Sequence, residues 1–305
     1  MVKSISDICS EYIAIKQKTL RESTLCSYRS ALKMVSNYLS DKGIVSLSEI
    51  TKDTITGFTL TLTGYSSASA NMLLSKFSGL LKHAYEQGYI VNDVARYCLK
   101  VICYKDSKIP DVFSVEEINR AIAVIDTTTA IGKRNYAILM VSSRLGLRGS
   151  DIINLKFRNL RFDTDTIEIS QSKTEKRLAL PMSDEVGMAL INYLREGRPK
   201  SDSGFIFLQH KPPYPPLKHF IKSIVANYHA RSAGFETGDT RTLGVRSLRH
   251  SLASAMLANN TSIYKIKDFL GHESIDTTMR YIKIDQPSLC QCALEVPPVF
   301  TEKEA

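Results

Sequence analysis

The chain has 305 residues, 43% of them apolar and 23% charged, which is enough to bury a core and excludes a disordered or low-complexity protein. Its longest apolar run, Tyr136 to Val141, is too short to span a bilayer, and Met1 to Tyr12 lacks the apolar stretch of a secretory signal, so we expect a cytoplasmic protein without membrane contact. Six scattered cysteines predict neither a disulfide scaffold nor a metal site. The 40 Lys and Arg residues against 31 Asp and Glu residues favour a polyanionic partner, most simply nucleic acid.

The first third of the chain has the pattern of a small helical domain. Apolar residues recur at helical spacing in four segments, which are Ile5 to Gln17, Thr24 to Leu39, Asp53 to Leu62 and Ala68 to Gln87. The stretch Lys100 to Ser114 breaks this pattern and places Pro110 ahead of a new helix start. We therefore expect a helical domain over residues 1–105 and a linker over residues 106–113.

Both sides of this linker are basic. Residues 1–112 contain 14 basic and 10 acidic side chains, and residues 113–305 contain 26 and 21. A protein that grips DNA with two domains has such a balance, and so do two basic domains that bind nothing acidic.

The rest of the chain mixes helices with one predicted β-hairpin. Alternating apolar and polar residues over Thr166 to Gln171 and Arg177 to Met182 predict two strands joined by an exposed polar turn. Helices are predicted around this hairpin, at Val115 to Ile125, Ile131 to Arg144, Asp184 to Leu194, His219 to Ala233, Ser247 to Asn259, Ser262 to Leu270 and Ile275 to Lys283. The fold class is mostly α with a small antiparallel β-sheet.

The most informative motif runs from Leu270 to Ile282. Gly271 can end one helix in a left-handed cap and Ser274 can cap the next, so His272 is held on a tight connection. Tyr281 lies away from the apolar stripe of the second helix. Its phenol can therefore face a ligand near His272, although an off-stripe tyrosine is also an ordinary surface residue.

Three further clusters carry cationic side chains. Arg246 and Arg249 lie three residues apart on one helical face, which indicates an anion between them or a solvated basic face. Arg148 stands at the entrance of a short helix that Ser150 can cap, and Asp151 can hold this arginine or form a plain surface ion pair. The last cluster is Lys173 in the hairpin turn, where a lysine is commonly only solvated.

Taken in chain order, Arg148, Lys173, Arg249, His272 and Tyr281 resemble the active-site set of the tyrosine recombinases, the phage-integrase family of site-specific DNA recombinases. The match is specific, because Leu-Gly-His-x-Ser-x-x-x-Thr-x-x-Tyr is expected by chance in about one such chain in 10⁵. The resemblance implies a helical, SAM-like core-binding domain over residues 1–105 and an α+β catalytic domain over residues 114–286. Within the family, the chain resembles the short, Xer-like integrases of mobile elements.

The resemblance also implies a mechanism without metal, ATP or other cofactor. Tyr281 would attack a DNA phosphodiester, form a 3′-phosphotyrosine link and release a 5′-hydroxyl. Arg148 and Arg249 would stabilise the charge that develops on the phosphate, Lys173 would protonate the departing oxygen, and His272 would orient the phosphate. The implied partners are double-stranded DNA and further copies of the chain, as a homotetramer on two recombination sites with a dimer on each. The tail over residues 287–305 would dock on a neighbouring protomer, and an accessory recombinase or directionality factor would be a further partner.

One position departs from the family pattern. The usual third motif is His-x-Leu-Arg-His, whereas this chain has Arg246 in the first position and His250 in the last. An arginine stays protonated and cannot act as a general base, but it donates hydrogen bonds to phosphate oxygens. The acceptor of the Tyr281 proton therefore stays open among water, His272 and a phosphate oxygen, and His250 is interpreted as a packing residue.

Contacts of the first domain with DNA are predicted from basic and aromatic residues on its helices. These candidates are Arg21, Tyr28, Arg29, Lys33, Lys76 and Lys82. Exposed helical lysines that only aid solubility are the alternative interpretation.

Two other functions remain compatible with these motifs. The first is a type IB topoisomerase-like activity, which shares the nick-and-reseal step but needs no second duplex. The second is a DNA-binding accessory protein with a weakened catalytic set, for which Arg246 is the only indication. A metal-dependent nuclease is disfavoured, because the sequence has no carboxylate cluster or His-x-His pair.

Overall fold

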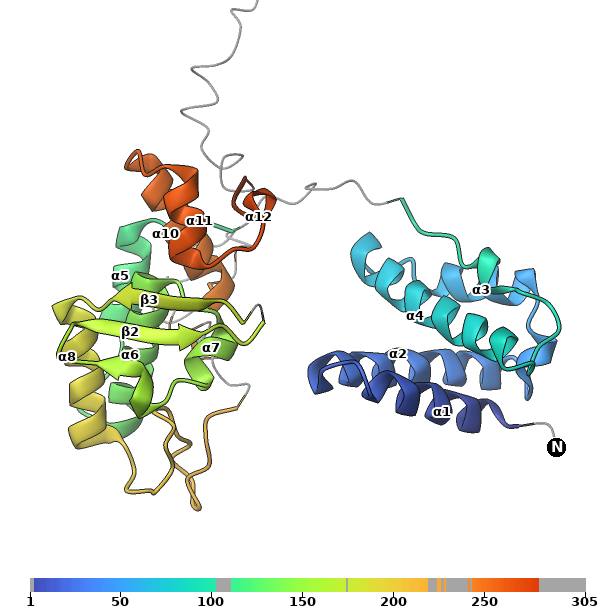
Figure 1. Cartoon of the computed structure of the whole chain (residues 1–305), viewed down its shortest axis with the longest axis horizontal. Coiled ribbons are helices and arrows are strands. Elements are labelled where there is room, and N and C mark those ends of the chain that lie inside the picture. Colours follow the sequence, from blue (N-terminus) through green and yellow to red (C-terminus); the bar gives the residue numbers. More distant parts are fainter. Residues whose placement is uncertain are drawn as a thin grey trace, which may run out of the picture. The chain divides into compact units, whose positions relative to one another are not determined.

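The chain forms two compact units, residues 1–105 and residues 106–305, in a computed structural model (Figure 1). The structure describes residues 3–102, 111–173, 175–218, 224–225, 228, 241 and 243–279. Most of the predicted linker 106–113 and of the predicted helix His219 to Ala233 lies outside this part, as do Tyr281 and the tail 287–305. Among the described residues, no helix combines the length and apolarity that crossing a membrane requires.

The first unit is a bundle of helices, as the apolar spacing predicts. Its elements are α1 (Ile5–Gln17), α2 (Glu22–Asp41), α3 (Lys52–Thr61) and α4 (Ser67–Glu86), with short 3₁₀ turns at Leu47–Glu49 and Ala95–Tyr97. Three of the helices begin at hydroxyl side chains that accept a backbone N–H, namely Ser4, Thr51 and Ser66. Phe58 and Phe77 pack edge to face in the core, with ring centroids 5.2 Å apart.

The second unit packs helices against a small sheet around a core of its own. Its helices are α5 (Val115–Ala123), α6 (Ala130–Leu145), α7 (Gly149–Ile153), α8 (Asp184–Asn192), α10 (Val245–Ala258), α11 (Ile263–Leu270) and α12 (Ile275–Met279). A 3₁₀ turn at Phe157–Asn159 precedes the sheet, and a π-helical turn at Tyr193–Gly197 follows α8. Helix α6 is buried along most of its length and joins α8, α10 and the sheet in one hydrophobic core.

The sheet is antiparallel, with the strand order β1 (Leu160–Arg161), β2 (Thr166–Ser170) and β3 (Arg177–Pro181). In the predicted hairpin, Ile167 pairs with Leu180 and Ile169 with Leu178. Ile167, Ile169 and Leu180 are buried, so one face of the hairpin covers the core, as the alternation predicts. Strand β1 was not predicted, because two residues are too few to show an alternation.

Two helices of the second unit end at glycines in the left-handed conformation. Gly146 ends α6 with a φ of 59°, and Gly271 ends α11 with a φ of 65°. The cap at Gly271 confirms the prediction made for that residue. Residues that carry a Cβ atom rarely adopt such a φ, whereas glycine adopts it without steric cost. Both turns lead directly into segments that carry predicted catalytic residues.

Ser150 does not cap the short helix, so this prediction is wrong. Helix α7 begins at Gly149, and the residue in the capping position is Arg148, which makes no side-chain capping bond. Ser150 therefore lies inside the helix, where its hydroxyl is 3.5 Å from Asp151 Oδ1. The prediction for Ser274 is confirmed, because its hydroxyl accepts the backbone N–H of Asp276 in the first turn of α12.

Candidate active site

Four segments of the second unit position the predicted catalytic side chains. Arg148 lies between α6 and α7, Lys173 lies in the turn between β2 and β3, Arg246 and Arg249 lie on α10, and His272 lies between α11 and α12. Tyr281, the predicted nucleophile, lies outside the described residues. Hydrogen bonds between these segments fix several of the side chains relative to one another.

Arg249 is held between the ends of two helices. Its side chain is buried, and its Nη1 and Nη2 atoms donate to the carbonyls of Gly146 at 2.7 Å and Leu270 at 2.6 Å. The last carbonyls of a helix have no partner within the helix, and they carry the negative end of its dipole. These carbonyls therefore anchor the guanidinium of Arg249 favourably, and they accept hydrogen bonds from two of its five N–H groups.

Arg148 is held by an amide side chain and not by a carboxylate. Its Nη1 atom donates to Gln171 Oε1, and Gln171 Nε2 donates to the carbonyl of Leu270 at 2.9 Å. The expectation that Asp151 holds Arg148 is wrong, since Asp151 Oδ1 accepts the backbone N–H of Ser172 at 2.8 Å. Asp151 thus fixes the hairpin turn, and Gln171 fixes the arginine.

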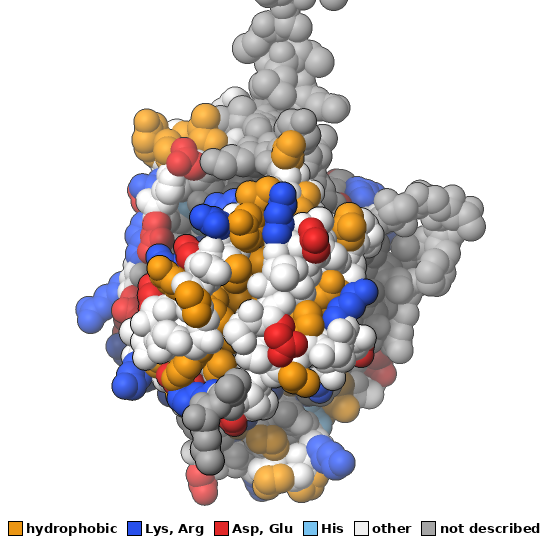
Figure 2. All heavy atoms as spheres, turned by 90° about the vertical axis from the view of Figure 1, so that its right-hand side faces the viewer, with side chains coloured by type: hydrophobic (Ala, Val, Ile, Leu, Met, Phe, Trp, Pro, Cys, Tyr) orange, Lys and Arg blue, Asp and Glu red, His pale blue; other side chains and the backbone are white. Residues whose placement is uncertain are grey.

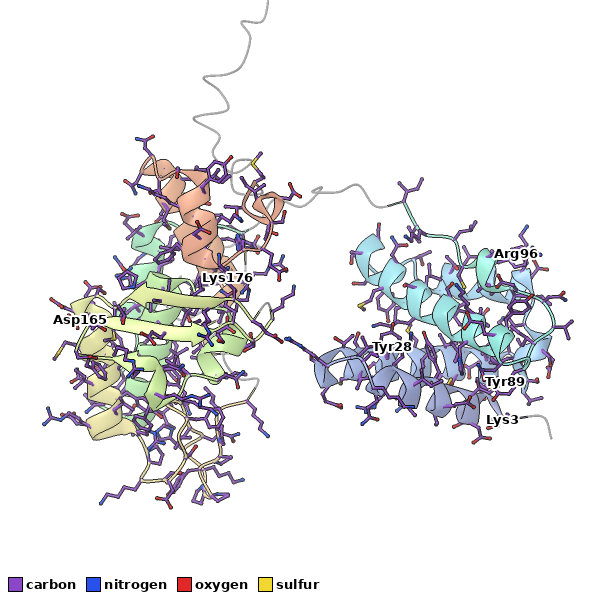
Figure 3. The ribbon with its side chains drawn as sticks, in the orientation of Figure 1. Lys3, Tyr28, Tyr89, Arg96, Asp165 and Lys176 are labelled. Carbon is purple, nitrogen blue, oxygen red and sulfur yellow. The ribbon has the colours of Figure 1, made fainter. Side chains whose placement is uncertain are left out.

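Lys173 is exposed on the turn that Gln171 closes. The N–H of Gln171 donates to the carbonyl of Lys176 at 2.9 Å, and the N–H of Glu175 donates to the carbonyl of Gln171 at 2.8 Å. Lys176, labelled in Figure 3, forms an ion pair with Asp268 at 3.2 Å and so links the start of β3 to α11. The turn that carries Lys173 is therefore tied to its surroundings at both ends.

His272 is buried and neutral. Its side chain is 3% exposed, and its Nδ1 atom lies 2.8 Å from Thr278 Oγ1. Burial lowers the pKa of His272, and the positive charges of Arg249 and Arg148 add to this effect, so that the pKa falls to about 3. A neutral imidazole carries one N–H, which it can donate to a phosphate oxygen.

Arg246 is the exposed member of the pair on α10. Its Nε atom donates to His250 Nε2 at 3.3 Å, whereas Arg249 is buried. Arg246 thus lies at the surface of the helix that carries Arg249.

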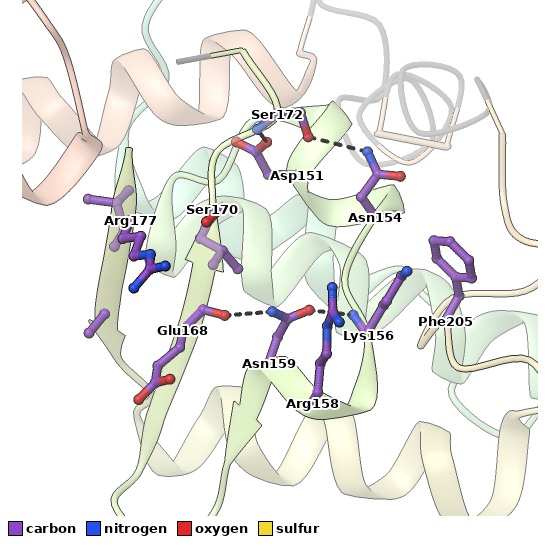
Figure 4. A pocket seen from close by; sticks show the side chains of 13 residues that line it. Asp151, Asn154, Lys156, Arg158, Asn159, Glu168, Ser170, Ser172, Arg177 and Phe205 are labelled. Carbon is purple, nitrogen blue, oxygen red and sulfur yellow. Dashed lines mark hydrogen bonds between the residues drawn. The ribbon is translucent and has the colours of Figure 1, made fainter. Parts of the chain in front are cut away.

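An open pocket of about 800 Å³ borders the Lys173 turn (Figure 4). The figure shows Asp151 and Asn154 reaching Ser172 at one end of the pocket. At the other end, Asn159 joins the carbonyl of Glu168 to the N–H of Lys156. Asn159 is thus a half-buried amide that bridges two main-chain groups, and its hydrogen bonds involve neither Arg148 nor Arg249.

The predicted DNA contacts of the first unit differ in their exposure. Arg21, Arg29, Lys33 and Lys82 are exposed, and Arg29 forms an ion pair with Glu22. On the face seen in Figure 2, Lys and Arg side chains are interspersed with apolar and acidic ones. Contacts of these four exposed residues with DNA stay a prediction.

Two of the predicted contacts belong in part to the core of the first unit. Lys76 is only 6% exposed, its Nζ donates to the carbonyl of Ser27 at 3.1 Å and lies 5.3 Å from the centre of the Tyr28 ring, and burial lowers its pKa. Tyr28 itself is half buried, with its ring centroid 6.1 Å from that of Tyr12. A direct phosphate contact by Lys76 would require its ammonium group to leave Ser27.

The sequence motifs did not reveal Gln171 or assign a role to Thr278. For Gln171 one signal exists, because its position continues the inward-facing series of Ile167 and Ile169, where an apolar residue is expected. Thr278 belongs to the motif that contains His272, but its fully buried hydroxyl and the contact with Nδ1 require the structure.

Comparison with known proteins agrees with this fold and site. Residues 111–287 match the phage integrase family, and residues 4–101 match the phage integrase SAM-like domain. The integrase/recombinase y4rA of Sinorhizobium fredii is 28% identical over 282 residues, which are 92% of this chain and 68% of that protein. Tyrosine recombinase XerC of Oceanobacillus iheyensis is 25% identical over 301 residues, covering 96% of this chain and 95% of that protein.

A solved structure shares the fold over nearly the whole chain. The lambda integrase(75-356) dimer bound to a COC' core site has a TM-score of 0.70 at 16% identity, with 97% of this chain and 100% of that chain covered. The fold and the site define a tyrosine-type DNA strand-exchange enzyme. The chain belongs to the phage integrase family, which confirms the predicted family and the predicted fold class.

Proposed function

We propose that the chain is the site-specific recombinase of a mobile element, and that it cleaves and rejoins DNA through a phosphotyrosine intermediate at Tyr281. The observation that carries this proposal is the fixed pair of guanidiniums, because Arg148 and Arg249 are joined through Gln171 and the carbonyl of Leu270. Two anchored cations beside a neutral histidine suit a phosphodiester whose oxygens gain negative charge.

In the cleavage step, Tyr281 Oη attacks the phosphorus and the bond from phosphorus to the 5′ oxygen breaks. The free phenol has a pKa of about 10, so its proton must leave during the attack, and the 5′ oxygen takes a proton from Lys173. The covalent link conserves the energy of the broken bond, so that a 5′-hydroxyl of a partner strand can reverse the step without ATP or a metal ion.

Each anchored guanidinium contributes by binding the transition state more tightly than the ground state. A fork of N–H groups makes charge-assisted hydrogen bonds to the two non-bridging oxygens. Removing one such preorganised donor typically raises a barrier by about 3–4 kcal/mol. Arg148 and Arg249 share this role, and Arg246 supplies a further cation in place of the usual histidine.

His272 acts in this scheme as a neutral hydrogen-bond donor. With a pKa of about 3 it is a poor general base, so the Tyr281 proton is assigned to solvent water or to a phosphate oxygen, which becomes more basic as it gains charge in the transition state. When Thr278 Oγ1 donates to Nδ1, the imidazole carries its proton on Nε2, which can then donate to the phosphate.

The proposed partners are double-stranded DNA and further copies of the chain. The first unit (residues 1–105) and the catalytic unit (residues 114–286) would clamp the duplex, joined by the linker 106–113. That lambda integrase is solved as a dimer on a core site supports one dimer per site, and two such dimers give the tetramer in which strands exchange. The tail 287–305 would dock on a neighbouring protomer, accessory factors would set the direction, and the reaction would take place in the cytoplasm.

The test is covalent trapping on nicked duplexes from the ends of the DNA element that encodes the protein, with a chelator and without ATP. Wild type and Tyr281→Phe are compared on denaturing gels. We expect a protein–DNA adduct on the cognate ends only, and none with Tyr281→Phe.

Other outcomes would assign the chain differently. An adduct on any duplex would favour a topoisomerase-like activity. Salt-sensitive binding without an adduct would indicate an accessory DNA-binding protein, and an adduct with Tyr281→Phe would reject this nucleophile.

A further inference from the structure

We infer that Gln171 is a positioning residue that sets the two catalytic guanidiniums relative to each other and to the turn that carries Lys173. This inference rests on the proposed function, because it assigns Gln171 a role in the same cleavage step. It goes beyond that function by adding a residue that touches neither the DNA nor the reacting atoms.

The side chain of Gln171 connects the two arginines by one route. It is 1% exposed, its Oε1 atom accepts from Arg148, and its Nε2 atom donates to the carbonyl of Leu270 at 2.9 Å. The same carbonyl accepts from Arg249 Nη2 at 2.6 Å. One amide and one carbonyl thus link two guanidiniums whose like charges repel each other, and both accept hydrogen bonds from them.

Only an amide makes both of these contacts. Arg148 requires an acceptor and the Leu270 carbonyl requires a donor, and the two ends of the glutamine amide supply one of each. A glutamate would turn an oxygen toward the carbonyl, and a methionine would fill the space without either hydrogen bond. With either replacement the carbonyl of Leu270 loses the hydrogen bond from residue 171, which is unfavourable where water is excluded.

The main chain of Gln171 extends this connection to the general acid. Its N–H and its carbonyl close the turn through Lys176 and Glu175, at 2.9 and 2.8 Å. Lys173 lies inside this closed turn. A displacement of Gln171 would therefore move the Arg148 contact and the Lys173 turn together.

Gly271 leaves the space that Gln171 occupies. A Cβ atom on Gly271 would lie 2.6 Å from Gln171 Nε2 and 2.7 Å from Leu178 Cδ1. The glycine that ends α11 is thus also the residue that allows the amide to reach the last carbonyl of that helix. Sequence reasoning gives the first of these roles, and only the structure gives the second.

The experiment measures single-turnover cleavage of a nicked cognate duplex by the full chain carrying Gln171→Met or Gln171→Glu. The matched control is Asn159→Ala, which removes another amide with two main-chain hydrogen bonds, at 2.7 and 2.8 Å. These bonds go to Lys156 and Glu168 and involve neither Arg148 nor Arg249, and Asn159 lies in the 3₁₀ turn before β1. We expect both Gln171 variants to cleave about 10- to 100-fold more slowly, as misplaced catalytic groups do, with unchanged affinity for DNA. Asn159→Ala should cleave like wild type.

A second substrate separates the arginines from the general acid. In a 5′-bridging phosphorothiolate the leaving group is a thiolate, which departs without a proton, so this substrate should restore cleavage by Lys173→Ala. It should not restore cleavage by Gln171→Met, because the transition-state charge on the phosphate still needs correctly placed guanidiniums. Thermal unfolding of each variant shows whether a slower rate reflects loss of the fold.

Three results would overturn the inference. They are a wild-type rate in both Gln171 variants, a defect no larger than that of Asn159→Ala, and full rescue of Gln171→Met by the phosphorothiolate. If Gln171→Met does not fold, Gln171→Glu, which is nearly equal in shape, decides the question by the same measurements. Failure of wild type to form an adduct would instead reject the proposed function, so the two failures are distinguishable.

Discussion

At the scale of single residues, the environment of His272 determines which chemistry this side chain can perform. Burial and the neighbouring guanidiniums of Arg249 and Arg148 lower the pKa of His272 from 6.5 to about 3. An imidazole in such a place is a hydrogen-bond donor over the working pH range and not a proton shuttle. The cleavage rate should therefore show no inflection from His272 between pH 5 and 8.

The same pKa difference makes the fold of the second unit sensitive to acid. The unfolded chain binds a proton at His272 below pH 6.5 and the folded chain binds it only near pH 3, so stability from this residue is complete above pH 6.5 and declines as the pH falls. The decline from one such group is at most about 1.4 kcal/mol per pH unit. Urea unfolding at several pH values should show a shallower decline in His272→Gln than in wild type. Equal pH dependence in the two proteins would contradict the lowered pKa.

The contact between Thr278 and His272 provides a further prediction. Thr278→Val keeps the shape of the buried side chain but removes the hydroxyl that lies 2.8 Å from Nδ1. We expect cleavage to slow about tenfold without loss of DNA affinity, a typical effect of losing a partner that orients an active-site histidine. Nitrogen NMR of His272 should report a changed tautomer, and Thr278→Ser should behave like wild type. A Thr278→Val variant with normal tautomer and normal rate would exclude this role.

The local structure around the proposed catalytic residues was predictable from the sequence where the residues that determine it are close in the chain. His272 follows Gly271 directly, and the left-handed turn that holds it was predicted from this dipeptide. The partner of Arg148 was not predictable, because Gln171 is 23 positions away and the nearer Asp151 instead accepts from Ser172. Which side chain reaches which group depends on packing that no local pattern encodes.

At the scale of elements, the apolar periodicity predicted the long helices and the hairpin, but it carries little signal for short pieces. Helix α7 has five residues and was expected from the motif around Arg148, whereas strand β1 has only two residues and was not predicted. Helix α7 matters for the site, because it brings Asp151 to the Lys173 turn. Short elements are formed by tertiary contacts, so their sequences carry little signal.

The turn at Gly271 provides a prediction that separates two physical effects. Gly271→Ala meets both an unfavourable φ of +65° and a clash with Gln171, whereas Gly88→Ala meets only a φ of +74°, with nothing within 4 Å of its Cβ. We expect Gly88→Ala to destabilise its unit by about 1 kcal/mol and Gly271→Ala to destabilise its own by about 2–4 kcal/mol. Chemical denaturation measures both losses, and only Gly271→Ala should slow cleavage. Equal losses would show that the Gln171 side chain moves aside without cost.

At the scale of the whole molecule, two units with separate cores share a basic character. The core around Phe58 and Phe77 belongs to the first unit, and the core around α6 belongs to the second. The proposed catalytic groups that the structure describes all come from the second unit, and we propose that the first unit contributes affinity and site selection. Contacts of both units with DNA phosphates are compatible with the charge of the chain, because basic residues outnumber acidic ones in both parts, with 26 basic residues in 113–305 and 14 in 1–112.

The salt dependence of DNA binding tests which basic residues of the first unit contact phosphates. Each phosphate contact releases about one counterion, so its loss should make the slope of log affinity against log salt less negative by about 1. We expect this change for Arg21→Ala, Lys33→Ala and Lys82→Ala, whose side chains are exposed.

Lys76→Ala is the contrasting case, because its ammonium group is buried against Ser27 and Tyr28. It should leave the salt slope unchanged and lower the unfolding temperature of the first unit, since the Ser27 carbonyl would lose its donor. A reduced slope for Lys76→Ala would show that DNA draws this ammonium group out of the core. Unchanged slopes for the three exposed residues would place the phosphate contacts of the first unit on other side chains.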